Sequence, residues 1–302
     1  MRLKTQLAIK ADIEALPPRA WGRKDFQVYL KERRQHWNAP QYLNTTGLID
    51  FLLENEIART EEIHSSEYGK KSRYVTGYLS PFEFALSFFK HSYLSHGTAL
   101  HLHGHAPEGK IFVNHEQTAK KSTSRLSQRG IDQAFRNQPR RSAFEFKTKT
   151  SSITFLNGKN TGNAGVIDFV GPNGERLRTT SLERTLIDCV VRPQYAGGIA
   201  EVAAVFLTAC DHASIPEIAQ LLAKTKYAYP YHQAIGFLLE RAGVNRDKLA
   251  PLRKNSIRFN FHLDYGVKES GFDDAWKIHY PLHLGIPSSG LTPEQRSAVS
   301  IN

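Results

Sequence analysis

The stretch from residue 44 to residue 79 constrains the fold more than any other part of the 302-residue chain. It begins with the cap-forming residues NTT, and apolar residues at helical spacing follow as far as Leu53. Segments 57–64 and 73–79 are rich in β-branched and aromatic residues, and the polar turn 65–72 separates them. We therefore expect a short helix followed by a β-hairpin whose tip carries two lysines.

The preceding residues extend this pattern to a complete domain. Residues 3–16 are amphipathic and end before two prolines, Trp21 fits a short strand, and residues 24–37 form a second amphipathic helix. The order helix, short strand, helix, helix, hairpin is that of a winged helix. We predict an α+β protein, with an N-terminal winged helix-turn-helix domain at 1–80 and a larger mixed α/β domain after it.

A winged helix binds double-stranded DNA with one helix in the major groove and its hairpin, the wing, on the phosphates. Asp50 and Glu54 lie opposite the apolar stripe of the third helix and would repel phosphates, so only its amino-terminal end is suited to reading DNA. The simpler alternative is a helix packed on an ordinary hairpin with solvated lysines. The candidate DNA contacts are Arg23, Lys24, Asn44, Thr45 and Thr46 at the helix starts, and Tyr68, Lys70, Lys71 and Arg73 in the wing.

The second domain is expected at 81–286, followed by a polar tail at 287–302. Ser80-Pro81 begins a helix, and the apolar residues after it predict that this helix is buried. Thr180 and Glu183 match a capping box. Strands are expected at 110–115, 143–149, 151–156, 165–170, 175–179 and 276–280, and helices at 181–190, 197–210, 215–225 and 230–242.

The formal charge of +11 favours an anionic partner, and nucleic acid is the first candidate. Residues 1–80 hold 13 Lys/Arg and 10 Asp/Glu, a net of +3, whereas residues 105–150 hold 10 and 4, a net of +6. The second, more basic stretch is a further nucleic-acid surface, a surface for an acidic protein, or a solubilising face. Its candidate residues are Lys120, Lys121, Arg125, Arg129, Arg136, Arg140 and Arg141, of which Lys121, Arg125 and Arg129 would align on a helix.

Other features narrow the class of protein. No apolar run is long enough for a transmembrane helix, and the first residues lack the pattern of a signal peptide, so we expect a cytoplasmic protein with no membrane partner. Cys189 and Cys210 lie within apolar helical patterns, which predicts buried, reduced thiols.

Three ordered segments resemble the AbiEi antitoxin family of type IV (abortive infection) toxin–antitoxin systems. They are YLSHGTALHLHG at 93–104, TSLERTLID at 180–188, and RP at 192–193 followed by GGIAEV at 197–202. The resemblance extends over roughly residues 1 to 280. It implies a repressor with two tasks: the winged helix would bind operator DNA in its own promoter, and the larger domain would counteract a toxin of nucleotidyltransferase type. Antitoxins of this type are described as acting on the toxin's effect rather than through a stable complex, so the resemblance implies a genetic partner and leaves direct contact with the toxin open.

The sequence gives weaker support for a metal site and for a nuclease site than for DNA binding. His96, His101, His103 and His105 cluster, but residues two apart on a helix point to different sides, so we expect no metal and a packed, hydrogen-bonded His103. Glu145 and Lys147 match half of a Mg²⁺-dependent nuclease motif, yet Asp132 upstream lies in a helical pattern. Arg184 and Asp188 are read as an ion pair on one helix face.

We therefore expect an antitoxin and autorepressor that is not an enzyme and needs no cofactor. The alternative is a winged-helix regulator without a toxin, whose second domain senses a ligand or dimerises. The distant alternative is a Mg²⁺-dependent nuclease.

Overall fold

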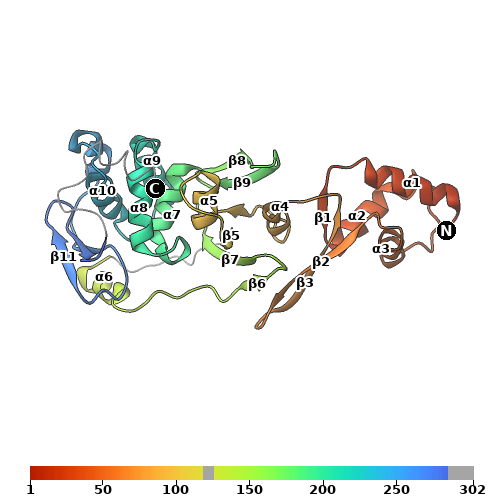
Figure 1. The fold of residues 1–302 in the computed structure, drawn as a ribbon, viewed down its shortest axis with the longest axis horizontal. Helices are drawn as coiled ribbons and strands as arrows, with labels where there is room; N and C mark the ends of the chain where they lie inside the picture. The colour runs from red at the N-terminus through yellow and green to blue at the C-terminus, as the bar shows by residue number, and fades with distance from the viewer. Residues whose placement is uncertain (118–125, 285–302) are drawn as a thin grey trace.

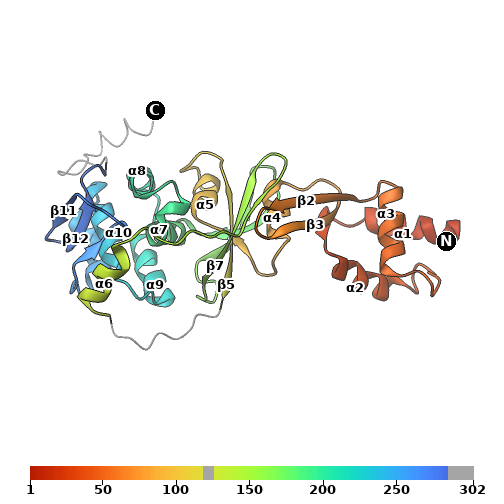
Figure 2. The same ribbon diagram turned by 90° about the horizontal axis from the view of Figure 1, so that it is seen from below.

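The computed structural model describes residues 1–117 and 126–284, which form an elongated molecule with a small domain at one end (Figure 1). Figure 2 shows the same succession along the long axis after a quarter turn: the helices of the small domain, then strands, then a helical part. The α+β fold predicted from the sequence is confirmed.

The small domain has the topology of a winged helix. Strand β3 pairs antiparallel with both β1 and β2, and the three helices pack against this sheet around a core of their own, in which the Trp21 and Phe26 rings stack at 4.7 Å. Its elements are α1 (Leu3–Glu14), β1 (Arg19–Trp21), α2 (Arg23–Arg33), α3 (Thr45–Glu54), β2 (Arg59–Ser65) and β3 (Gly69–Thr76).

The chain then enters a larger sheet through α4 (Pro81–Leu86). Ser80 caps this helix, since its Oγ accepts from the Glu83 N–H and the Glu83 carboxylate accepts from the Ser80 N–H. Within the described residues, nine strands form one sheet in the order β1-β3-β2-β6-β7-β5-β4-β9-β8. The elements of this middle part are β4 (Tyr93–Leu94), α5 (His96–Leu102), β5 (Ile111–Gln117), β6 (Glu145–Lys147), β7 (Ser152–Lys159), β8 (Val166–Val170) and β9 (Arg176–Thr180).

The sheet continues across the predicted domain boundary. His64 of β2 pairs with Lys147 of β6, so strand β2 of the wing is also an inner strand of the large sheet. Ile63 and Val75 of the wing are buried in one cluster with Phe146 and Phe155 of the middle part. The wing is therefore fixed on both sides.

The remaining helices form a third layer with the largest core. Ser181 caps α7 by accepting from the Arg184 N–H, so the expected capping box at Thr180 and Glu183 is wrong by one residue; Glu183 instead accepts from the Ser214 N–H. Cys189 and Cys210 are buried thiols, as predicted. The elements are α6 (Gln128–Phe135), α7 (Leu182–Val191), η1 (Pro193–Tyr195), α8 (Ile199–Ala209), α9 (Ile215–Thr225), α10 (Tyr231–Arg241), η2 (Arg246–Leu249), α11 (Ala250–Arg253), β10 (Phe261–His262), β11 (Ser270–Asp273) and β12 (Ile278–Pro281).

Candidate functional site

The amino-terminal ends of α2 and α3 lie together on the surface of the winged helix. The Arg23 guanidinium donates to Thr46 Oγ1 at 2.6 Å and so joins the two helix starts. Asn44 caps α3, because its Oδ1 accepts from the Gly47 N–H at 2.9 Å. The side chains of Arg23, Lys24, Asn44 and Thr46 are exposed and that of Thr45 is half-buried. The structure thus brings together the five candidate residues predicted at the helix starts.

The loop before α3 is held by Arg34, which the sequence did not single out. Its guanidinium donates to the carbonyl oxygens of Pro40 and Leu43 at 2.6 and 2.7 Å. Asp50 and Glu54 are exposed on α3, as expected. The acidic stretch of this helix therefore begins directly after its amino-terminal turn.

The wing residues have contacts within the protein. Lys70 Nζ lies 2.8 Å from Glu62 Oε1, and this hydrogen bond lowers the pKa of Glu62. Lys71 Nζ lies 5.6 Å from the centroid of the Phe144 ring, and the Tyr68 ring packs edge-on against the same ring at 4.7 Å. Lys70 and Tyr68 are exposed and Lys71 is half-buried. The wing tip thus packs on the segment leading into β6.

Arg73 has a structural role. Its guanidinium donates to the carbonyl oxygens of Ser87 and Phe88 and stacks on the Phe88 ring at 4.4 Å. Burial lowers its pKa. Because these donors are used within the protein, we remove Arg73 from the DNA contacts assigned to the wing.

The second basic surface is only partly described. Lys120, Lys121 and Arg125 lie outside the described residues, so their alignment with Arg129 stays a prediction. Arg129 and Arg136 are exposed at α6, which lies at the opposite end of the molecule from α3 (Figures 1 and 2). Arg140 and Arg141 are exposed at the mouth of a cavity in the middle part.

The three segments that carry the family resemblance pack against one another. Leu94 pairs with Thr179 in parallel strands, and His103 Nε2 donates to the Thr180 carbonyl oxygen at 2.8 Å. The His96 ring stands edge-on to the Tyr195 ring at 5.4 Å. The expectation of a packed, hydrogen-bonded His103 is confirmed.

A buried ion pair lies at this meeting point. Arg184 Nε donates to Asp188 Oδ1 at 2.8 Å, with side chains 2% and 4% exposed. The Tyr227 hydroxyl donates to the same carboxylate oxygen at 3.1 Å. Burial opposes the charge of Arg184, but the Asp188 carboxylate raises its pKa overall. The spacing of the pair was predicted, whereas its burial was not.

The loop after β7 is shaped around Arg184. Its Nη1 donates to Thr161 Oγ1 at 3.0 Å and to the Ala164 carbonyl oxygen. Gly165 follows with φ +73°, and a Cβ there would lie 2.7 Å from the Arg184 Cβ. Only glycine combines this backbone with such a close approach. Glu116 holds the other side of the loop by accepting from the N–H groups of Thr161 and Asn163.

A cavity of about 610 Å³ opens in front of this ion pair, and we call it the basic cavity. Five cationic side chains and one carboxylate line it. Burial and the neighbouring Lys226 lower the pKa of one of them, Lys159, and burial lowers the pKa of His96 to about 4, so this histidine is neutral at pH 7. The charged lining residues are Arg140, Arg141, Lys159, Arg184, Arg192 and Asp188.

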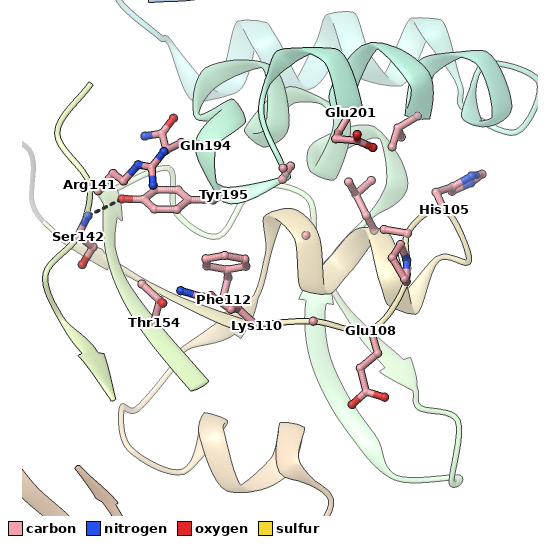
Figure 3. A pocket seen from close by; sticks show the side chains of 18 of the residues that line it. His105, Glu108, Lys110, Phe112, Arg141, Ser142, Thr154, Gln194, Tyr195 and Glu201 are labelled. Atoms are coloured by element: carbon pink, nitrogen blue, oxygen red, sulfur yellow. Dashed lines mark hydrogen bonds between the residues drawn. The ribbon is translucent and has the colours of Figure 1, made fainter. Parts of the chain in front are cut away.

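A second cavity of about 570 Å³ has Leu100, Phe112 and Val205 in its lining, and we call it the apolar cavity (Figure 3). The charged side chains of Glu108, Lys110, Glu145 and Glu201 also line it. Both cavities share Arg141, Ser142 and Tyr195 in their walls. The Ser142 N–H donates to the Tyr195 hydroxyl at 2.8 Å, which fixes the dividing wall. Figure 3 shows the Phe112 ring below that of Tyr195, with Gln194 beside Arg141.

The residues of the weaker patterns have other partners. Asp132 accepts from Gln128 at 2.9 Å and lies 3.0 Å from His262 Nε2, whereas Glu145 is paired with Lys110 at 2.8 Å. The nuclease motif thus has its two carboxylates on separate elements. Among residues 1–117 and 126–284, no group of three or more His, Cys, Asp or Glu is arranged to hold a metal ion. None of the helices in the same ranges has the length and apolar composition needed to cross a bilayer.

Comparison with known proteins identifies a structural neighbour. No family model matches the chain, and no curated protein matches it. The fold is similar to the crystal structure of the RV2827C protein from Mycobacterium tuberculosis, at 13% sequence identity, with 91% of each chain covered and a TM-score of 0.51. At this identity the similarity extends to the fold and to nothing finer.

Sequence reasoning missed both cavities. Their walls come from segments far apart in the chain, and no spacing rule links Arg140 to Lys159 or Arg192. One signal was available, since Arg184, Asp188 and Arg192 all lie in segments that carry the family resemblance. A concentration of charged residues in otherwise apolar helices marks such a place.

Proposed function

We propose that this protein is a DNA-binding transcriptional regulator that represses its own promoter. The observation that carries the proposal is the joining of the α2 and α3 starts by the Arg23–Thr46 hydrogen bond, on the surface of a winged helix. Exposed N–H groups, a cap residue and two cationic side chains there suit phosphates and base edges. The net charge of +11 favours association with DNA.

We further propose that the protein acts in the cytoplasm as the antitoxin of a type IV system and has no enzymatic activity. The support is the resemblance of three segments to the AbiEi family and their packing into one unit beside the basic cavity. In this proposal the winged helix binds operator DNA, and the rest of the chain counteracts a nucleotidyltransferase-like toxin.

The DNA proposal is tested by titrating a duplex of the protein's own promoter at several salt concentrations. Each phosphate neutralised contributes about 0.9 to the slope of log affinity against log salt. Arg23→Gln with Lys24→Gln should therefore flatten the slope by about one to two units. The matched control removes two exposed charges at the other end of the molecule, Lys224→Gln with Lys248→Gln, and should leave the slope unchanged. Equal slopes for all three proteins would exclude the helix starts from the interface.

The antitoxin proposal is tested by co-expression with the adjacent gene, scored for rescue of growth. Rescue should persist in the Arg23→Gln, Lys24→Gln variant when both genes are under foreign promoters, because that variant alters only the DNA contacts. A neighbouring gene without a nucleotidyltransferase-like product would favour the second candidate, a regulator that senses a ligand. The two adjoining cavities are the observation that supports this candidate.

A further inference from the structure

The basic cavity has a charge that the DNA proposal does not use. Five cationic side chains face one carboxylate, and that carboxylate is already paired with Arg184. Arg184 is held by three acceptors and is fully buried, so its position is set by the fold. The cavity therefore has an excess of positive charge, most of it on exposed arginine side chains around the buried Arg184–Asp188 pair.

Such an arrangement is suited to a phosphate group. Guanidinium groups offer planar pairs of donors that match phosphate oxygens, and lysine adds a compact charge. Arg140, Arg141 and Arg192 are exposed in the lining of the cavity, whereas Arg184 is buried. Lys159 is half-buried, and its Nζ donates to the Lys226 carbonyl oxygen. Asp188 Oδ2 is buried and has no partner within the described chain, which leaves one acceptor for a ligand donor.

The apolar cavity supplies a place for a ring. The rings of Phe112 and Tyr195 stand 5.5 Å apart in its wall. Both polar atoms of the Gln194 amide are buried without a partner in the described residues, although Gln194 lines this cavity. An amide offers one acceptor and two donors, as the edge of a nucleobase requires. Figure 3 places this side chain beside Arg141, next to the wall shared with the basic cavity.

We propose that the two cavities form one binding site for a phosphorylated ligand of nucleotide size, with its phosphate in the basic cavity and its ring in the apolar cavity. Volumes of about 610 and 570 Å³ lie in the range of small-molecule sites. Arg141, Ser142 and Tyr195 line both cavities, so the two lie side by side, and a ligand that spans them would pass over these three residues. The inference goes beyond the proposed function and does not depend on it.

The test is calorimetric titration of the full-length protein, without DNA or toxin, with the four ribonucleoside monophosphates, the matching nucleosides and inorganic phosphate. At least one monophosphate should bind at least tenfold more tightly than its nucleoside and than inorganic phosphate. A trinucleotide with a 5′-phosphate, compared with the same trinucleotide bearing a 5′-hydroxyl, separates a free nucleotide from a nucleic-acid end as the source of the phosphate. Tighter binding of the phosphorylated trinucleotide than of any monophosphate would assign the site to the end of a strand.

Variants assign the binding to these cavities. Arg140→Gln and Arg192→Gln should each weaken the bound monophosphate at least fivefold, whereas Arg136→Gln, an exposed arginine outside both cavities, should not. Gln194→Leu should weaken the monophosphate but leave inorganic phosphate unchanged, since it alters only the ring end. Two results would overturn the proposal. The first is that neither any monophosphate nor the phosphorylated trinucleotide binds at about 10 mM, which is ten times a weak dissociation constant of about 1 mM. The second is that Arg136→Gln and Arg192→Gln have equal effects.

Discussion

At the residue scale, the Arg184–Asp188 ion pair is buried, with side chains 2% and 4% exposed. Both charges are withdrawn from water, and each needs the other to offset that loss of hydration. Arg184→Met should lower the free energy of unfolding by about 3–5 kcal/mol, because it leaves the Asp188 carboxylate buried and uncompensated. Urea unfolding followed by circular dichroism measures this change.

The control is the exposed pair Lys10–Glu14, which has the same spacing on α1. Glu14→Gln should change the free energy of unfolding by less than about 1 kcal/mol, since exposed pairs contribute little. Equal losses in Glu14→Gln and Arg184→Met would contradict the importance given to burial.

His96 makes stability depend on pH. Burial lowers its pKa from an ordinary value near 6.5 to about 4, so the unfolded chain binds more protons than the folded one between those values. The contribution of His96 to the free energy of unfolding is therefore fully present above pH 6.5 and is lost as the pH falls toward 4. The loss amounts to about 3 kcal/mol, at about 1.4 kcal/mol per unit of pKa.

His96→Asn isolates this contribution. Position 96 has φ +52°, a backbone conformation that asparagine tolerates better than most residues. The variant should be less stable than the parent at pH 7, and the difference should shrink as the pH is lowered to 4.5. Parallel curves of unfolding free energy against pH would show that His96 is not the group responsible.

Sequence spacing predicted the pairing of Arg184 with Asp188, but it did not predict the cap of α7 or the burial of the pair. Arg184 and Asp188 are four apart, so their pairing follows from helix geometry. The cap of α7 is Ser181 rather than Thr180. Both residues have a hydroxyl, so the sequence does not distinguish them as caps. The path of the backbone after β9 decides which hydroxyl reaches the free N–H group. The burial of the pair depends on the loop 160–165 and on Tyr227, which no local pattern places beside it.

At the element scale, the wing is joined to the rest of the protein through β6. Phe146 of β6 is fully buried and packs against the rings of Tyr68 and Phe155. Phe146→Ala should lower the free energy of unfolding by about 3–5 kcal/mol, since it leaves a cavity between the wing and the sheet. Phe272→Ala, the same change at a ring 39% exposed, should cost less than half as much. Similar costs in urea unfolding would mean that the wing makes no stable contact with β6.

Single helices and strands followed from the sequence because their signals are local. Period 3.6 in α8, α9 and α10, and the proline and serine at the start of α4, predicted those elements close to their observed ends. The pairing of β2 with β6 joins residues more than 80 positions apart. Such a pairing depends on which hydrophobic faces meet in the folded chain, and β6 itself is too short to specify a partner.

At the scale of the whole molecule, contacts between segments far apart in the sequence also form the candidate sites. The residues proposed to contact DNA lie within one local domain, so they were predicted together. Arg73 is the exception, because its acceptors lie on the chain after α4. The basic cavity needs residues from β7, α7 and the segment before β6 at once. A single sequence holds no measure of those distances.

The shared sheet predicts how the whole chain unfolds. The winged helix has its own core, as does the helical part, but the third cluster contains residues of both the wing and the middle strands. Unfolding either end would expose that cluster to water. We therefore expect the chain to unfold in one cooperative transition in spite of its elongated shape.

The tryptophans allow each end to be followed separately. Trp21 and Trp37 are buried in the core of the winged helix, and Trp276 is buried in that of the helical part. Trp276→Phe leaves fluorescence that reports only the winged helix, whereas Trp21→Phe with Trp37→Phe leaves a signal from the helical part alone. In each variant the fluorescence midpoint in urea should coincide with the midpoint from circular dichroism of the same protein. If the middle cluster couples the unfolding of the two ends, Phe146→Ala introduced into either variant should make the fluorescence midpoint differ from the circular dichroism midpoint. Separate midpoints before that change would mean that the two ends fold independently and that the continuous sheet adds no cooperativity.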